Sequence, residues 1–343
     1  MRRRSLLCRT LSSRILRSLR PSSIPLLGLA MLLAAPPPSA AVTIDWVPVG
    51  DAGNTADSAS NCFAASCGSV GYAYFISKYE TTNAQYTEFL NAVDPGGSNT
   101  LELYNSDMNS DASNGGISFL AGNANASKYV VKSGFASKPV TYVNFFDALR
   151  FANWLNNGQG SGDTETGAYT LLGGTPSPSN GGSVTRNGGA ITFLTSENEW
   201  YKAAYFNGTT YFNYPAGTDT QTVCALPTAT ANRANCNDAV GAVADVGAYT
   251  GSASPYGTFD QGGNVNEWNE QIVGSNRGLR GGAWNSAASS LDASARSSAS
   301  RVTELGTYGF RVASLVPEPG TGLLVMAGLL GLAARPRRPA KAL

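Results

Sequence analysis

The sequence predicts an α+β fold that is rich in loops, with a few helices and short strands. Capped amphipathic segments and short β-rich segments are both present, but they do not alternate regularly as they do in a βαβ protein. Long polar, glycine-rich stretches such as residues 94–100 and 171–189 predict loops between them. Residues 42–316 are enough for one large domain or two small ones, and no linker-like segment divides them.

Three helices are predicted from their capping residues. Thr82 is followed three residues later by a glutamine, which is capping-box spacing, and the second helix is expected to start at Asn144. Either Thr195 or Ser196 is expected to cap the third helix, with Glu199 completing its box. The apolar residues expected on the buried faces of the first two helices are Tyr86, Phe89, Leu90, Val93, Phe145, Leu149, Ala152 and Leu155.

Short segments rich in β-branched and aromatic residues predict the strands. They are residues 43–50, 72–80, 190–194 and 308–315. The last of them is expected to form a single closing strand.

Residues 1–41 predict a secretory signal peptide. Seven arginines precede an apolar run at residues 24–35, and small residues lead to Ala41, after which cleavage is expected. A membrane span needs about 20 apolar residues, so this run is too short to be one. The leader is therefore interpreted as an export signal.

The C-terminal residues 316–343 have three parts. The peptide Val316-Pro317-Glu318-Pro319 is followed by an apolar stretch at 322–334 and a basic end. This predicts a short hydrophobic helix whose cationic end stays on the cytoplasmic side of a membrane. The layout resembles a PEP-CTERM sorting signal, which implies export by a Gram-negative-type bacterium and handling by an exosortase-like membrane enzyme. The protein would be held in the membrane by this helix before processing, and would then reach the cell surface, outer membrane or extracellular matrix.

Without these ends the chain is acidic. Seven of the 24 cationic residues lie in the leader and four in the tail, which leaves 13 against 22 acidic residues for 42–316, a net charge of −9. Nucleic-acid binding depends on lysine and arginine contacts to phosphate. The charge therefore argues against a nucleic-acid partner.

Four cysteines remain once Cys8 is removed with the leader: Cys62, Cys67, Cys224 and Cys236. An even number in an exported protein predicts disulfides. Pairing between neighbours is preferred, although four cysteines allow three connectivities. A zinc site is the alternative, but the closely spaced pairs that zinc sites use are missing.

Six segments, in order, resemble the sulfatase-modifying-factor family, the formylglycine-generating-enzyme domain. They are YFISKYETTNAQYTEFL, KPVTYVNFFDALRFANWL, ITFLTSENEWYKAA, SPYGTFDQGGNVNEW, GLRGGAWNS and YGFRVA. Two positions depart from the family's motifs: Thr195 replaces a proline and Asn266 replaces a tryptophan. The resemblance covers residues 42–315 and implies a formylglycine-generating-enzyme-like fold related to C-type lectins, with bound calcium.

Calcium is also suggested by the residues themselves. Asp260 and Glu267 flank a glycine-rich turn, and calcium takes about 6–8 oxygen ligands, often including backbone carbonyls. The alternative is that these two carboxylates cap turns or meet arginines. The residues that the resemblance assigns to two calcium sites are Asp260, Gly263, Val265 and Glu267 for the first, and Asn232, Arg233, Asp238 and Val240 for the second.

The family's oxidase chemistry is not expected in this chain. The resemblance implies two cysteines that hold copper(I) in catalytic members, and their positions fall on Ser286 and Leu291. Neither side chain replaces a thiolate, which copper(I) prefers. Nucleophilic catalysis by a serine is also not expected, because no histidine is present to activate the serine. A formylglycine-generating oxidase acting on a peptide or protein substrate is kept as the alternative.

Two further sets of residues are candidate catalytic groups. Lys78 and Lys202 are candidate bases, but the sequence ties neither to a serine. Glu199 and Glu267 are candidates for a glycosidase-like carboxylate pair, for which a structural role is the favoured interpretation.

A binding surface is predicted instead at Trp284, Asn285 and Ser286. An aromatic face beside amide and hydroxyl groups suits a glycan or a peptide. The alternative is that Trp284 belongs to the core. The other side chains expected in the core or paired with its acids are Trp154, Trp200, Trp268, Arg280, Arg296 and Arg311. The sequence therefore predicts an exported, calcium-stabilised binding or structural module.

Overall fold

The computed structural model describes residues 41–58, 61–62 and 66–316. The predicted signal peptide, apart from Ala41, and the predicted sorting helix lie outside these residues. Within the described ranges, no helix is long and apolar enough to cross a membrane. The fold described below is that of the body of the chain.

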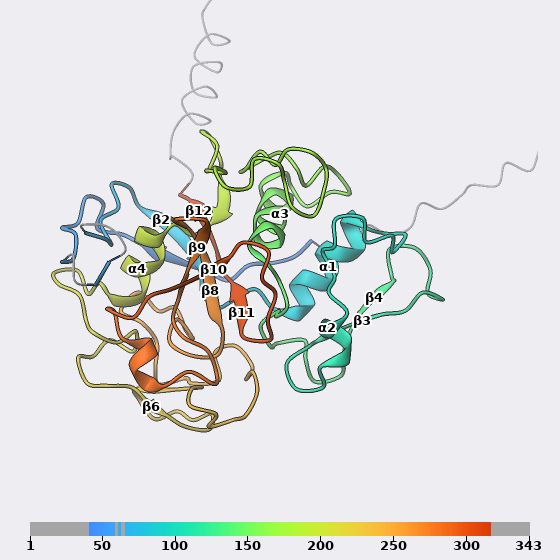
Figure 1. Ribbon diagram of the computed structural model, residues 1–343. Coiled ribbons are helices and arrows are strands. Elements are labelled where there is room, and N and C mark those ends of the chain that lie inside the picture. Colours follow the sequence, from blue (N-terminus) through green and yellow to red (C-terminus); the bar gives the residue numbers. More distant parts are fainter. Residues whose placement is uncertain (1–40, 59–60, 63–65, 317–343) are drawn as a thin grey trace, which may run out of the picture. The chain divides into compact units, whose positions relative to one another are not determined.

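Two four-stranded sheets form the centre of the domain (Figure 1). In sheet order the first contains β1 (Trp46–Val49), β2 (Tyr74–Ser77), β12 (Val312–Leu315) and β5 (Thr192–Leu194). The second contains β10 (Ser297–Ser300), β9 (Asn276–Arg280), β8 (Asn266–Val273) and β11 (Tyr308–Phe310).

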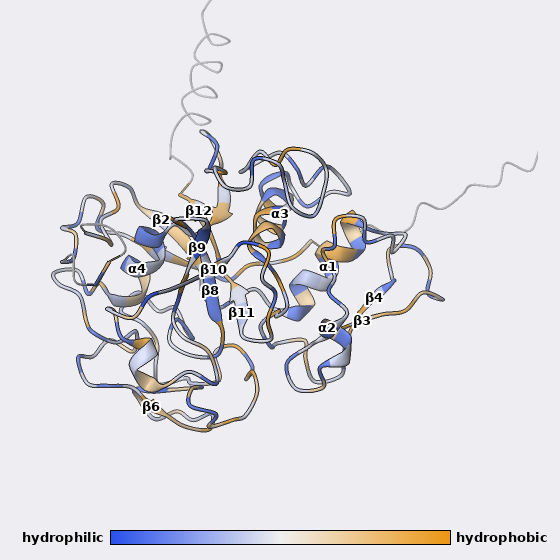
Figure 2. Ribbon diagram, in the orientation of Figure 1, coloured by the Kyte–Doolittle hydropathy of each residue, from blue (hydrophilic) through white to orange (hydrophobic). Residues whose placement is uncertain are grey.

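Short helices and two strand pairs surround these sheets. The helices are α1 (Asn83–Val93), α2 (Asp107–Ser110), α3 (Phe145–Asn156), α4 (Glu197–Tyr205) and the 3₁₀ turn η2 (Ala288–Leu291). The pairs are β3 (Ile117–Phe119) with β4 (Tyr129–Val131), and β6 (Val223–Cys224) with β7 (Arg233–Ala234). Figure 2 shows hydrophobic residues on α1 and α3, and hydrophobic and hydrophilic residues interspersed along the loops.

The three predicted helices are confirmed, and each begins with a capping box. Thr82 caps α1, Asn144 caps α3 and Ser196 caps α4. The choice that the sequence left open at the third helix thus falls on Ser196. Thr195 is instead buried, and its carbonyl accepts a hydrogen bond from the backbone of Glu270. In each box the third residue of the helix bonds back to the cap, which satisfies donors that would otherwise be unpaired.

The predicted closing strand at 308–315 is wrong as a single element. It divides at Arg311 into β11, which pairs in parallel with β8, and β12, which pairs antiparallel with β2 and β5. The chain therefore passes from one sheet to the other at this residue. Arg311 is completely buried at that crossing, so a cation lies between the two sheets.

An aromatic cluster forms the core between helices and sheets. Five ring pairs have centroids 5.2–6.4 Å apart in edge-on, tilted or stacked arrangements, and they connect Tyr86, Phe89, Phe151 and Phe310. Such pairs contribute about 0.5–1.5 kcal/mol beyond the burial of their area. These contacts fix α1 and α3 to the strand that leads into Arg311.

Candidate functional site

The segment after β9 contains the two positions where the resemblance places metal-binding cysteines. Leu291 is fully buried and belongs to an apolar cluster with Tyr214, Ala234 and Cys236. The Ser286 hydroxyl accepts a hydrogen bond of 3.0 Å from the backbone N–H of Ala283. One position is thus a hydrocarbon side chain in the core and the other a hydroxyl, so the pair does not fit copper(I), which is a soft ion.

Both neighbour-paired disulfides are confirmed, Cys62–Cys67 and Cys224–Cys236. The second lies beside the site, which the sequence did not suggest. The backbone N–H groups that follow Cys236 donate to the carbonyls of Ser286 and Trp284, at 2.8 and 2.9 Å. Because both cysteines are bonded to each other, they present no thiolate to the site.

A groove with a volume of about 310 Å³ opens beside Ser286. It lies where β8 begins, β9 ends and β10 begins. Its polar lining consists of Asn266, Arg280, Ser286, Ser290, Arg296 and Ser297. Small residues and Leu279 form the remainder of the lining. We call this cavity the β9–β10 groove.

The predicted ligand residues do not all line this groove. Ser286 does, and Asn285 beside it is exposed. The Trp284 ring is half-buried, and its indole N–H donates to the carbonyl of Gly306 at 3.2 Å. Trp284 thus borders a neighbouring part of the surface. By contrast Trp154, Trp200 and Trp268 lie in the core.

The predicted anchoring arginines have different partners. Arg280 is buried and pairs with Glu197, and two further bonds reach the carbonyls of Ala293 and Ala295 at 2.7 Å. The guanidinium of Arg296, which is exposed, donates to the carbonyl of Cys62. These contacts position both arginines at the β9–β10 groove, and Arg296 also ties the Cys62–Cys67 loop to it.

Glu267, a predicted calcium ligand, meets an arginine instead. Both of its oxygens accept from Arg311, at 2.6 and 2.7 Å, and one also accepts from the indole N–H of Trp200 at 2.7 Å. A carboxylate so fully engaged by a cation does not fit a calcium ligand. The alternative that the sequence left open for this residue is the one observed.

Asp260 does fit a cation site, together with a residue that the sequence missed. Burial raises the pKa of Asp260 to about 6. Burial and the nearby Asp260 charge raise the pKa of Glu80 well above its usual value. Oε2 of Glu80 is buried with no hydrogen-bond donor among the described residues. Two crowded carboxyl groups with an unsatisfied oxygen would be relieved by a bound cation.

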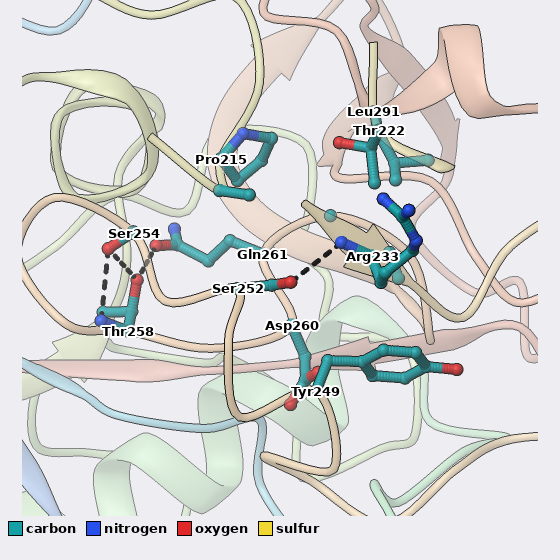
Figure 3. A pocket seen from close by; sticks show the side chains of 13 residues that line it. Pro215, Thr222, Arg233, Tyr249, Ser252, Ser254, Thr258, Asp260, Gln261 and Leu291 are labelled. Carbon is teal, nitrogen blue, oxygen red and sulfur yellow. Dashed lines mark hydrogen bonds between the residues drawn. The ribbon is translucent and has the colours of Figure 1, made fainter. Parts of the chain in front are cut away.

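Figure 3 shows the side chains that line the cavity next to Asp260, which is too small for an organic ligand. Its volume is about 20 Å³, which is room for roughly one water molecule. Ser254 and Thr258 are hydrogen-bonded on one side, where Thr258 also donates to Gln261. We therefore do not assign it as a binding pocket.

The loop predicted for the second calcium site has two buried amide oxygens without a donor. They belong to Asn232, which was predicted, and to Asn235, which was not. The Asn235 amide N–H₂ donates to the carbonyl of Ala242 and to Asn264, and Asn264 in turn donates to Glu80. Asp238 is exposed. Buried, unpaired amide oxygens are hard donors of the kind calcium uses, so this loop fits the ion.

Within the described residues, no group of three or more acidic or cysteine side chains could hold a metal ion. A calcium site would therefore depend on amide and backbone oxygens. The backbone carbonyls assigned by the resemblance, those of Arg233, Val240, Gly263 and Val265, remain predictions.

The candidate catalytic groups have structural partners. Lys202 is buried and donates to the carbonyls of Gly50 and Asp51, and burial lowers its pKa. Lys78 lies over the rings of Tyr79 and Phe259, at 5.3 and 5.5 Å. Glu199 pairs with Arg186 at 2.7 Å, and Glu267 pairs with Arg311. All four groups are therefore engaged in contacts that stabilise the fold.

Residues 36–316 match the Sulfatase-modifying factor enzyme 1-like domain. The chain belongs to this family. Residues 315–338 match the PEP-CTERM protein-sorting motif, as predicted. The motif and the two disulfides together indicate an exported protein and processing by an exosortase-type sorting enzyme.

Solved structures resemble the domain over most of its length. Treponema denticola variable protein 1 is 18% identical with a TM-score of 0.52, over 79% of this chain and 95% of that chain. CarF is 18% identical with a TM-score of 0.46, over 80% of this chain and 99% of that one. PvdO from Pseudomonas aeruginosa is 16% identical with a TM-score of 0.40, over 71% and 81%. No relative among the curated proteins is significantly similar.

The family match and the likeness to the Treponema protein establish the fold. It is the predicted α+β, formylglycine-generating-enzyme-like fold related to C-type lectins. At such low identity, the likeness carries nothing about what this chain binds.

Proposed function

We propose that this protein is a non-catalytic binding module that calcium stabilises and that acts at the cell surface or in an extracellular matrix. The observation that supports it is that the segment after β9 has lost the copper-binding residues but still lines an open groove. The two positions that would hold copper are a bonded hydroxyl and a buried leucine, while an open groove lies beside the first of them. The domain therefore keeps a place for a ligand while lacking the donors for copper(I).

A glycan and peptide array tests the binding function. Purified protein should give hits in the presence of calcium, and a chelator should remove them. Trp284→Ala should also reduce the hits, because Trp284 lies two residues before Ser286 and its half-buried ring faces the adjoining surface. Trp46→Ala is the matched control, since Trp46 is 37% exposed and lies on β1 in the other sheet. An array without hits under both conditions would contradict the binding function and leave a scaffold role.

Calcium should raise the thermal stability of chelator-treated protein. An ion that binds only the folded state stabilises it by about 2.7 kcal/mol at a concentration 100 times its Kd. Asn235→Ala should abolish much of this response, because it removes an unpaired buried oxygen from the second loop. Asn125→Ala, at an exposed asparagine elsewhere, should leave it unchanged. Equal melting temperatures with calcium and with chelator, measured by calorimetry, would argue against a calcium site.

The oxidase alternative predicts oxygen uptake, whereas the proposed function predicts none. The protein should take up no oxygen when supplied with copper(I), a reductant and a cysteine-containing peptide, because Ser286 and Leu291 offer no thiolate. An oxygen electrode measures this directly. Oxygen uptake that is lost in Ser286→Ala would show that the site is catalytic, and the proposal would fall.

A further inference from the structure

The β9–β10 groove differs in charge from the rest of the domain. Among the described residues no acidic side chain lines it, whereas two arginines do. The other described cavities each include at least one carboxylate, such as Asp45 and Glu80 in one and Glu197 and Glu270 in another. In a body with a net charge of −9, a cavity lined only by cationic and neutral groups is unlike its surroundings.

The two arginines contribute unequally to this charge. Arg280 is buried, and its pairing with Glu197 compensates its charge. Arg296 is exposed at the rim, where its guanidinium donates to the carbonyl of Cys62, a neutral group. A guanidinium with several N–H donors suits a carboxylate or sulfate group.

The neutral lining is suited to hydroxyl groups. Ser286 accepts a hydrogen bond from a backbone N–H, so its own proton is left to donate toward the groove. Ser290, Ser297 and Asn266 add further hydroxyl and amide groups. Leu279 is the one large apolar side chain among the lining residues described. Peptide recognition relies on large apolar and aromatic anchors, which this lining does not provide.

We infer that the β9–β10 groove binds an acidic glycan, with Arg296 meeting its carboxylate or sulfate groups and the serine and asparagine side chains meeting its hydroxyls. The inference rests on the proposed binding function and assigns the chemical class of the ligand. Since the interaction is between charges at a partly exposed site, it weakens as salt is added.

Three probes test the inference by calorimetric titration: a galacturonic acid hexamer, its methyl ester, and a sulfated dextran of similar length. The acid should bind at least about tenfold more tightly than the ester, which has the same backbone without the charge. The acid and the sulfated dextran distinguish a uronate ligand from a sulfated one. If the ester binds as tightly as the acid, the inference is overturned and the binding function stands.

Substitutions at Ser290 place a charge in the groove without touching the arginines. Ser290→Asp should weaken binding of the acidic probe at least about tenfold, because like charges meet in one cavity. Ser290→Asn has nearly the same shape without the charge and should retain binding within a few-fold. Equal affinities for the two variants would overturn the inference. Thermal melts of both variants establish that each is folded before titration.

Arg296→Gln tests the cation itself and should weaken binding of the acidic probe about tenfold. Arg301→Gln is its control, because Arg301 donates to the carbonyl of Ser275 and does not line the groove. If none of the three probes binds, the inference falls. The array then decides separately whether the binding function survives, since neutral glycans or peptides would still give hits.

Discussion

Replacing Arg311 with alanine should lower the free energy of unfolding by about 3–5 kcal/mol, the cost of leaving one charge of a buried pair without its partner. Both Arg311 and Glu267 are completely buried, and the guanidinium contacts both carboxylate oxygens. Arg311 also donates to the carbonyls of Ser77 and Phe259, so its loss frees acceptors from three segments. Urea denaturation followed by circular dichroism measures the change.

An exposed ion pair supplies the control for this measurement. Lys138 and Asp245 lie 3.2 Å apart with side chains that are 22% and 58% exposed. Lys138→Ala should therefore cost no more than about 1 kcal/mol. If Arg311→Ala costs as little as Lys138→Ala, the pair does not hold the two sheets together, and the crossing at Arg311 must be stabilised by other contacts.

The elements that sequence reasoning predicted well are those whose signals are local. A capping residue, its partner three positions later and apolar residues at helical spacing all lie within one helix. The starts of α1 and α3 followed directly from Thr82 and Asn144. The disulfide pairing was also preferred correctly, because each cysteine has a near neighbour in sequence.

What the sequence did not predict depends on contacts between distant segments. The closing strand divides at Arg311 because its two halves pair with strands of different sheets, a choice that no local pattern records. Likewise the prediction of Glu267 as a calcium ligand rests on the glycine-rich turn that it flanks with Asp260 and on the family resemblance. The actual partner of Glu267, Arg311, lies 44 residues further along the chain.

The candidate site also depends on contacts between distant segments of the chain. The β9–β10 groove is formed by the start of β8, the end of β9 and the segment leading into β10, so its charge cannot be read from any one motif. Buried side-chain hydrogen bonds run from Asn235 to Asn264 and from Asn264 to Glu80, and they join segments separated by up to 184 residues. Sequence reasoning named Asn232 in that loop. The unpaired oxygen of Asn235 became visible only with the fold.

Gly263→Ala should be among the most damaging single substitutions in the domain. Gly263 has a φ of +89°, which costs an alanine about 1–2 kcal/mol. A Cβ there would also lie 2.4 Å from the carbonyl oxygen of Asn235, which belongs to the backbone and cannot move aside as the end of a flexible side chain could. Overpacking of this kind adds about 1–3 kcal/mol or more. The free energy of unfolding, measured in chelator so that no cation contributes, should fall by the sum of both effects.

Gly257→Ala separates the two costs. Gly257 has nearly the same φ, +92°, but nothing lies within 4 Å of the position its Cβ would take. It should therefore show the backbone cost alone, and the excess in Gly263→Ala measures how tightly the turn is pressed against the Asn235 loop. Equal losses in the two variants would mean that this loop moves away easily. A loop that moves so readily would not hold the side-chain amide oxygen of Asn235 in a fixed place for calcium. Equal losses would therefore also argue against the proposed cation site.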